Sequence, residues 1–171
     1  MSAPSETTGL DETAKKKDDN FVLDGATSEY ITVMIGDQLF GISVPMVQDV
    51  FMPESVTPVP MAMPEVAGVL NMRGRIVTAI DMRRRLDLPP RTDGKNGLAV
   101  GVEYRGESYG LVIDSVGEVL RVSDSSLERN PSNLDPRWRS ISMGVQQLKD
   151  RLMVLIDVEK VLDFQGRSIA A

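Results

Sequence analysis

Two carboxylates, Asp81 and Asp157, are the clearest candidates for acid–base chemistry, because each follows an isoleucine at the end of an apolar run. The chain contains no histidine and no cysteine. Their absence removes the commonest general base, the commonest metal ligand and every thiol nucleophile. An aspartate at a strand end also accepts hydrogen bonds from nearby backbone amides. We expect that structural role for both residues, and we predict no catalytic residue, no cofactor and no bound metal.

A run of three arginines at 83–85 is the strongest concentration of positive charge, with Arg73 and Arg91 nearby. Such a run could bind phosphate or an acidic protein surface, but most often it is a solvated face. The net charge of −6 and an aromatic content of 5% oppose nucleic-acid binding. No apolar run approaches the ~18 residues that span a bilayer. We therefore expect no nucleic-acid partner and no insertion into a membrane.

Arg73 is the most informative single charge, since it directly precedes the turn glycine of the segment Asn71–Gly74. If Asp49 lies close to it, the two side chains form an ion pair at the edge of a groove. An exposed pair adds only about 0–1 kcal/mol to stability. Its larger effect is to orient a partner and to set specificity. A purely structural ion pair fits the sequence equally well.

Short apolar runs separated by turn residues indicate the elements that position these side chains. Four prolines between residues 53 and 64 exclude a long helix there. Many short strands with frequent turns are typical of an all-β barrel or sandwich. Strands are expected at 31–35, 39–44, 76–82, 98–104, 109–122, 141–148 and 152–158, short helices at 83–88 and 159–164, a strand or one helical turn at 46–51, and an extended or briefly helical segment at 66–72.

Both chain ends are expected to lie outside this folded part. Residues 1–28 are rich in Ser, Thr, Asp, Glu and Lys and carry little to bury, which predicts a disordered tail. They contain no apolar signal core, which favours the cytoplasm. Residues 165–171 are interpreted as a short C-terminal tail. Among the ten methionines, Met61 and Met63 lie between prolines and are the expected exposed pair.

The two halves of the chain resemble each other, which decides the architecture. Gly41 and Gly110 lie 69 positions apart, and Gly68 and Gly144 lie 76 positions apart. The longer polar loop at 123–139 absorbs the difference. At the larger spacing Ile80-Asp81 also coincides with Ile156-Asp157, so a repeat accounts for the paired carboxylates without catalysis. Each copy is near the lower size for an independent core, so we expect the copies to pack together around a groove suited to docking.

Several stretches resemble the signature of the CheW family of chemotaxis coupling proteins. They are residues 47–50, 64–74, 76–77, 80–83, 109–116 and 155–162, and the resemblance covers about residues 29–164. It implies an all-β fold of two SH3-like five-stranded β-barrel lobes related by the internal repeat, with short helices. Lobe one would span about 29–92 and lobe two about 93–164. Family members can exchange a strand between the lobes, so this boundary is approximate.

The resemblance implies a non-enzymatic adaptor. Such proteins bind the regulatory domain of a CheA-type histidine kinase and the cytoplasmic tip of methyl-accepting chemoreceptors, in signalling arrays at the inner face of the membrane. The chain would be cytoplasmic, monomeric when free and recruited to those arrays. By similarity, the receptor-binding residues are Val47, Asp49, Val50, Gly68, Asn71, Arg73, Gly110 and Val112.

This sequence departs from the family pattern at three positions. Asp49 stands where Glu is more frequent, which shortens its reach toward Arg73 by one methylene group. Met72 and Met82 replace the more usual Leu at nearly constant volume, which should be mild. Surfaces that face the kinase are expected on exposed apolar loops at the outer ends of the lobes.

Three other functions fit parts of the sequence. A CheW-like adaptor of a non-flagellar pathway, such as surface sensing or pilus motility, would share every feature above. A small β-barrel enzyme is opposed by the absence of His, Cys and any acidic cluster. A nucleic-acid-binding barrel is opposed by the negative charge and the lack of aromatic platforms.

Overall fold

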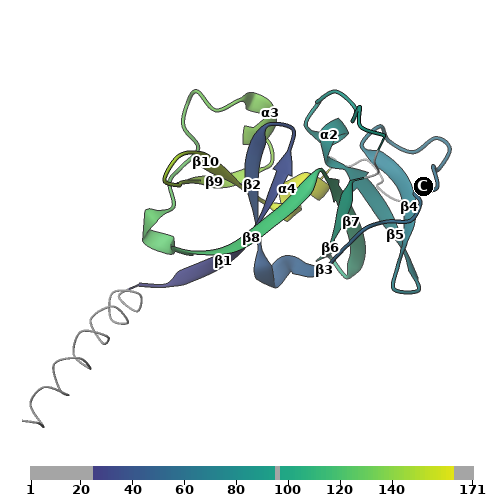
Figure 1. Cartoon of the computed structure of the whole chain (residues 1–171), viewed down its shortest axis with the longest axis horizontal. Coiled ribbons are helices and arrows are strands. Elements are labelled where there is room, and N and C mark those ends of the chain that lie inside the picture. Colours follow the sequence, from purple (N-terminus) through teal and green to yellow (C-terminus); the bar gives the residue numbers. More distant parts are fainter. Residues whose placement is uncertain (1–24, 95–96, 164–171) are drawn as a thin grey trace, which may run out of the picture.

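The computed structural model describes residues 25–94 and 97–163, which form two five-stranded sheets set side by side (Figure 1). We call the sheet ordered β8-β1-β2-β10-β9 the terminal lobe and the sheet ordered β3-β6-β7-β5-β4 the central lobe. The expected all-β fold with two five-stranded lobes is confirmed. The strands are β1 (Thr27–Ile35), β2 (Gln38–Ser43), β3 (Val47–Phe51), β4 (Val66–Met72), β5 (Arg75–Asp81), β6 (Leu98–Tyr104), β7 (Glu107–Ile113), β8 (Ser115–Ser123), β9 (Ser142–Gln147) and β10 (Leu152–Ile156).

Each lobe takes strands from both copies of the repeat. The first copy contributes β1 to β5 and the second β6 to β10. However, β1 and β2 pair with β8 and β10, while β6 and β7 pair with β3 and β5. The boundary expected near residue 92 therefore separates the two copies and not the two lobes, which corrects the lobe ranges 29–92 and 93–164. Two strands of each copy, rather than one, cross to the other sheet.

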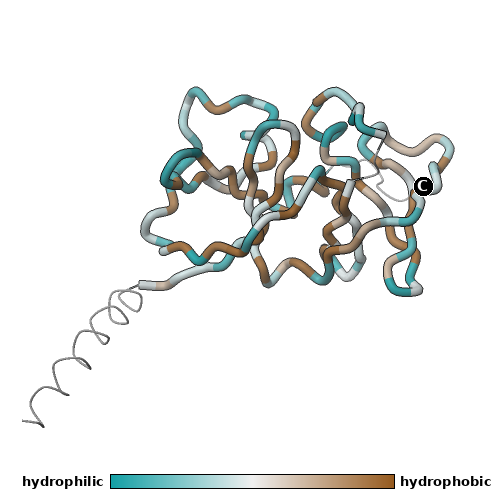
Figure 2. The backbone as a smooth tube through the Cα atoms, viewed as in Figure 1, coloured by the Kyte–Doolittle hydropathy of each residue, from teal (hydrophilic) through white to brown (hydrophobic). Residues whose placement is uncertain are grey.

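Three clusters of buried apolar side chains hold the sheets together. The largest takes fully buried residues from both lobes, such as Phe40 of the terminal lobe and Leu111 of the central lobe. The two smaller clusters each lie within one lobe. Because successive residues of a strand point to opposite faces, a strand buried on both faces is a continuous apolar run, as in Leu152–Ile156. Hydrophobic residues accordingly gather along the strands of both lobes (Figure 2).

The repeat is visible in backbone geometry at Gly68 and Gly144, which lie at equivalent irregularities of β4 and β9. Their φ angles are 146° and 151°, a region that side chains rarely adopt. A Cβ atom on Gly68 would lie 2.0 Å from the Thr57 carbonyl oxygen, and one on Gly144 would lie 2.8 Å from that of Glu128. In both lobes this close segment makes two backbone hydrogen bonds to the residue after the glycine, through the pairs Thr57–Val69 and Glu128–Val145.

Asp81 and Asp157 begin the equivalent helices α2 (Met82–Arg85) and α4 (Val158–Leu162). The Asp81 carboxylate accepts hydrogen bonds from two amides of the first turn of α2, and Asp157 does the same for α4. Side-chain acceptors at this position satisfy amides that have no partner within the helix. The structural role predicted for both aspartates is confirmed.

The long loop at 123–139 is more ordered than its polarity suggests. It contains a 3₁₀ turn, η2 (Asp124–Ser126), and helix α3 (Pro136–Arg139). The indole of Trp138 packs edge-on against Phe40, with ring centroids 6.1 Å apart. The loop is therefore anchored to the shared core by an aromatic residue within a polar stretch.

Two other expectations need adjustment. Of the strand or helical turn expected at 46–51, the strand is confirmed as β3, and the 3₁₀ turn η1 (Val44–Met46) precedes it. Strand β1 begins at Thr27, so the last residues of the predicted 1–28 tail are in the sheet. Residues 1–24 of that tail and residues 164–171 lie outside the described part of the chain.

Candidate partner-binding site

Asp49 and Arg73 form the ion pair that the sequence suggested. The Arg73 Nε atom lies 2.7 Å from Asp49 Oδ2, and Arg73 Nη2 donates to Asp49 Oδ1 at 3.3 Å. Asp49 Oδ1 also accepts from the Val50 amide at 2.9 Å. The Asp49 side chain is 18% exposed, whereas that of Arg73 is 80% exposed. A fixed carboxylate thus orients a guanidinium group that faces solvent.

The turn between β4 and β5 places Arg73 in this position. Arg73 has a φ of 51° and Gly74 a φ of 83°, so both residues are left-handed. Two consecutive left-handed residues match the twist of a two-residue hairpin. The Asn71 side-chain oxygen accepts from the Gly74 amide at 2.7 Å and stabilises the turn. Arg73 pays about 1 kcal/mol for a conformation unusual in a non-glycine residue, which the turn and the ion pair offset.

A pocket of about 480 Å³ lies beside the ion pair in the central lobe. Its walls combine strand β4, the start of β5 and the segment after β3. Met52 and Ile76 are 76% and 69% exposed, so large apolar side chains stand next to the Arg73 guanidinium. Such a combination suits an amphipathic partner. The pocket is lined by Met52, Glu54, Ser55, Thr57, Val69, Leu70, Asn71, Arg73 and Ile76.

Of the eight residues predicted to bind a receptor, the structure brings Asp49, Asn71 and Arg73 together at the surface. Gly68 is buried, but it lets the Thr57 segment approach β4 and so shapes the pocket wall. Gly110 is buried, and a Cβ atom there would lie 3.4 Å from the Leu70 side chain.

Val47, Val50 and Val112 do not join this surface group. Val112 is 5% exposed and belongs to the core of the central lobe. Val47 and Val50 are partly buried and pack against the core shared by the lobes. These positions maintain the shape of the lobe rather than line the pocket.

Met52 and Ile76 are the most exposed apolar residues among the pocket residues that the sequence did not predict. Ile76 lies in the apolar strand expected at 76–82, but its side chain is 69% exposed, and Val77 and Ala79 occupy the inner face. Alternation along β5 does not reveal this exposure, because Ile80 has the same parity as Ile76 and is fully buried. Of the two methionines predicted to be exposed, Met61 is fully exposed, whereas Met63 packs against the shared core.

The arginine run at 83–85 is more than a solvated face, because each side chain has partners within the chain, although that of Arg84 is 57% exposed. Arg83 binds Asp114 through Nε at 2.9 Å and Nη2 at 2.8 Å. Arg84 reaches Asp81 and the Pro64 carbonyl. Arg85 donates to carbonyl oxygens of α4. The run therefore serves internal contacts rather than phosphate binding.

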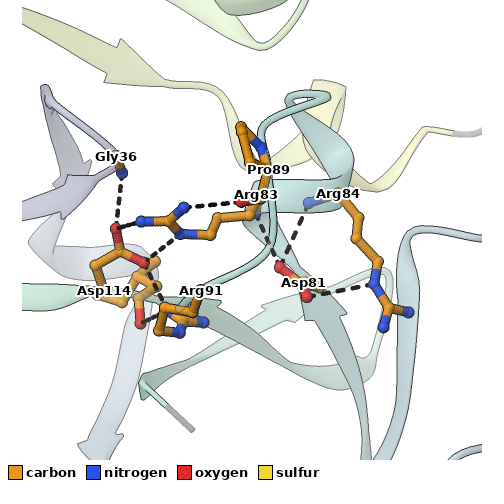
Figure 3. A network of polar contacts seen from close by, with 8 residues as sticks. Gly36, Asp81, Arg83, Arg84, Pro89, Arg91 and Asp114 are labelled. Carbon is orange, nitrogen blue, oxygen red and sulfur yellow. Dashed lines mark hydrogen bonds and ion pairs between the residues drawn. The ribbon is translucent and has the colours of Figure 1, made fainter. Parts of the chain in front are cut away.

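Asp114 is the centre of a polar network that also includes Arg91 and Gly36 (Figure 3). Burial alone would raise the pKa of Asp114, but hydrogen bonds from Arg83 and the Gly36 amide, with the charges of both arginines, hold it below its ordinary value of 3.8. The same hydrogen bond to Asp114 raises the pKa of Arg83. A second pocket of about 600 Å³ lies over the network, and Met52 lines both pockets.

Residues 25–94 and 97–163 contain neither a metal-ligand cluster nor a membrane-spanning helix. No group of three or more acidic side chains converges there in a way that could hold a metal ion. None of the helices in this part is long and apolar enough to cross a membrane.

Residues 29–165 match the family described as the CheW-like domain. The chemotaxis protein CheW of Rhizobium meliloti (strain 1021) is 27% identical over 142 residues, which cover 83% of this chain and 92% of that protein. The chemotaxis protein CheW of Bacillus subtilis (strain 168) is 29% identical over 143 residues, covering 82% and 90%. The crystal structure of the scaffolding protein TtCheW from Thermoanaerobacter tengcongensis matches with a TM-score of 0.74 at 23% identity, covering 84% and 93%. This chain therefore belongs to the CheW family and has its two-lobed, SH3-like fold.

Proposed function

We propose that this protein is a non-enzymatic cytoplasmic adaptor that couples chemoreceptors to a CheA-type histidine kinase in signalling arrays. Its membership of the CheW family supports a scaffold role in chemotaxis. The observation that carries the proposal is the exposed Arg73 guanidinium, fixed by Asp49 beside two exposed apolar side chains. A scaffold needs a surface of this kind and no reacting group.

The receptor tip is the proposed occupant of the pocket in the central lobe. An amphipathic helix would bury apolar residues against Met52 and Ile76. Arg73 would then donate to polar or acidic groups on the same helix. Because Asp49 already holds the guanidinium in place, little side-chain entropy is lost when the partner binds. The pair thus contributes orientation and specificity more than stability of the free protein.

The kinase is proposed to bind elsewhere, on exposed apolar residues at the outer ends of the lobes. Met61 lies on the connection between β3 and β4 and is fully exposed. On the terminal lobe, Leu127 and Met143 are 39% and 45% exposed. Two separate surfaces would allow one chain to hold both partners at once, with the free protein a monomer.

The test measures binding of the purified chain to a CheA-type regulatory domain and to a receptor cytoplasmic fragment. Arg73→Ala is expected to weaken receptor binding by about tenfold or more, as for a central charged contact. Val47→Ala should weaken it less, because Val47 supports the lobe from within. Arg75→Ala is the matched control, since Arg75 is exposed on the same hairpin but does not line the pocket.

Each outcome assigns the surface differently. If Arg73→Ala weakens receptor binding alone, both the coupling role and the receptor surface stand. If it weakens kinase binding instead, the pocket belongs to the kinase. If the unaltered chain binds neither partner, the coupling proposal fails.

A further inference from the structure

Asp114 occupies the single position where the chain passes from β7 of the central lobe to β8 of the terminal lobe. Its backbone amide donates to the Met34 carbonyl at 3.0 Å. Its carboxylate accepts from the Gly36 amide at 2.7 Å. Both of these partners belong to the β1–β2 hairpin of the terminal lobe. Asp114 is therefore bonded to the terminal lobe through backbone and side chain together.

The same carboxylate binds two arginines that follow β5 of the central lobe (Figure 3). Arg83 engages both carboxylate oxygens at 2.9 and 2.8 Å, and Arg91 donates to Oδ1 at 2.5 Å. Arg83 also donates to the Pro89 carbonyl, and Arg91 to the Ile113 carbonyl. We call Asp114 with Gly36, Arg83 and Arg91 the inter-lobe brace. It joins three chain segments that are distant in sequence: the β1–β2 turn, the segment that follows β5, and the junction of β7 and β8.

Burial distinguishes the brace from an ordinary surface ion pair. The side chains of Asp114, Arg83 and Arg91 are 19%, 19% and 14% exposed. Asp49–Arg73, by contrast, has an arginine that is 80% exposed. A bidentate arginine–carboxylate contact has a fixed geometry and is stronger than a hydrogen bond between neutral groups. The brace therefore has both the strength and the directionality to define an angle.

Helix α2 carries a second contact on its opposite side. Arg85 donates to the carbonyl oxygens of Val161 and Lys160 at 3.0 and 2.9 Å, near the end of α4. Helix α4 follows β10 of the terminal lobe, so this contact also crosses between the lobes. Arg83 and Arg85 thus tie one short helix to two different parts of the terminal lobe.

The apolar core between the lobes cannot supply the same definition alone. Apolar burial is non-directional and depends on area rather than on angle. Two curved sheets that share only such a core could rotate slightly at little cost. Hydrogen bonds between groups at fixed positions remove that freedom. The brace supplies such directional bonds between the lobes, and the Arg85 contacts with α4 and the hydrogen bond from Arg137 to the Asp87 carbonyl add to them.

We propose that Asp114 is a positioning residue, which sets the angle between the two lobes and thereby the spacing of surfaces that bind partners on different lobes. The link to partners rests on the proposed function, whereas the geometric statement does not. Loss of the brace should leave each binary interaction nearly intact. It should impair the simultaneous engagement of both partners, because their surfaces would no longer be held at one distance.

The geometric part is tested without any partner. Because the chain contains no cysteine, Arg75→Cys and Lys149→Cys introduce one spin label on each lobe, at exposed positions. Asp114→Asn should broaden and shift the measured distance between the labels. It should also speed hydrogen exchange of the Gly36 amide by about tenfold. Glu29→Gln removes an exposed ion pair with Arg121 that lies within the terminal lobe, so it should match the parent in both measurements.

Arg91→Gln removes one arm of the brace and guards against failure of Asp114→Asn to fold. It should broaden the distance distribution less than Asp114→Asn. If the folded variants have the parental distance distribution and the parental exchange rate at Gly36, the brace does not set the angle and the proposal is overturned.

The coupling part uses the same variants with a kinase and a receptor fragment. Asp114→Asn should keep each binary affinity within about threefold of the parent while losing receptor control of kinase activity. If a variant with a broadened distance distribution keeps full receptor control of kinase activity, the proposed positioning role of Asp114 is overturned. If the parent itself binds no partner, the proposed function fails, but the label distances still decide whether Asp114 sets the angle.

Discussion

The two lobes share a backbone arrangement but differ at the candidate partner-binding site. In the central lobe, the pocket beside the hairpin presents Met52, Arg73 and Ile76. The equivalent positions of the terminal lobe are Arg121, Lys149 and Leu152, and there the Ser126 hydroxyl donates to the buried Gln146 side chain at 3.1 Å. Within the described residues, Glu118 and Lys149 form no counterpart of the Asp49–Arg73 ion pair. The repeat thus preserves the frame, while the candidate partner-binding site occurs in one lobe.

A second difference concerns the helices that close each copy. After its capping aspartate, α2 presents Arg83 and Arg85 to the other lobe. At the equivalent positions, α4 has Glu159 and Val161. The position equivalent to Asp114 is Pro45, which has no side-chain acceptor. The residues of the inter-lobe brace therefore have no equivalents in the other copy of the repeat. The two copies share their strand arrangement but not the polar contacts between the lobes.

The largest effect on stability is expected at Gly68 and Gly144, the glycines at the equivalent irregularities of β4 and β9. Substitutions there test how closely the backbones of the two lobes correspond. Gly68→Ala combines a left-handed φ with a Cβ atom 2.0 Å from the Thr57 carbonyl oxygen. Strain and overpacking should together lower the free energy of unfolding by about 3 kcal/mol or more. Gly144→Ala has similar strain but a looser contact of 2.8 Å, so it should cost less. Urea denaturation of both variants measures the difference.

Gly74→Ala is the control for this comparison, since its φ is 83° but a Cβ atom would meet nothing within 4 Å. Its cost should be only about 1 kcal/mol. Equal losses for the variants at Gly68 and Gly144 would mean that the Thr57 segment moves aside. The pocket wall would then be softer than the close contact implies.

How far the fold could be predicted depends on whether its determinants are local. Strand β6 spans Leu98–Tyr104 as expected, and the turn after it uses left-handed Arg105 and Gly106. The strand exchange is not local, because it depends on the parallel pairs β2–β10 and β5–β7. Both copies have the same alternation, so no strand pattern states which copy it pairs with.

The candidate site shows the same limit. The Asp49–Arg73 ion pair could be suggested from the sequence, since Arg73 directly precedes a turn glycine, but the proximity of Asp49 could not be derived, because β3 and β4 lie at opposite ends of the strand order. The contribution of Ile76 to the pocket could not be predicted from the sequence, because its exposure depends on which face of β5 packs inward. Asp114 is one acid at a strand junction. Only the tertiary fold brings Arg83 and Arg91 to it.

The next largest effect tests whether the inter-lobe brace stabilises the protein while the equivalent positions of the other copy do not. At neutral pH, Asp114→Asn should lower the free energy of unfolding by about 1–2 kcal/mol, a value reduced for solvent screening of partly exposed groups. Glu159→Gln, at the position equivalent to Arg83, should be nearly neutral, because the Glu159 side chain is exposed and its cap bond uses the backbone amide. Chemical denaturation of both variants at several pH values is the measurement.

The pH dependence follows from the lowered pKa of Asp114. A carboxylate whose pKa is lower in the folded protein stabilises it above the ordinary value of 3.8, and this contribution is lost as the pH falls through the lowered pKa. The difference between the parent and Asp114→Asn should therefore be full at neutral pH and should close in strong acid. A difference that persists unchanged in acid would point to packing rather than charge.

The smallest effect compares the two helix caps. Asp81→Ala and Asp157→Ala each leave two first-turn amides without their acceptor, which should cost about 1 kcal/mol of stability. Asp81→Ala should cost slightly more, because Asp81 also pairs with Arg84 and begins the helix that carries the brace. Asparagine caps helices almost as well as aspartate, so the Asn variants at both positions should be nearly neutral. If the Asn variants lose as much as the Ala variants, negative charge rather than cap geometry stabilises α2 and α4, and the two copies would owe their likeness to electrostatics at the helix ends.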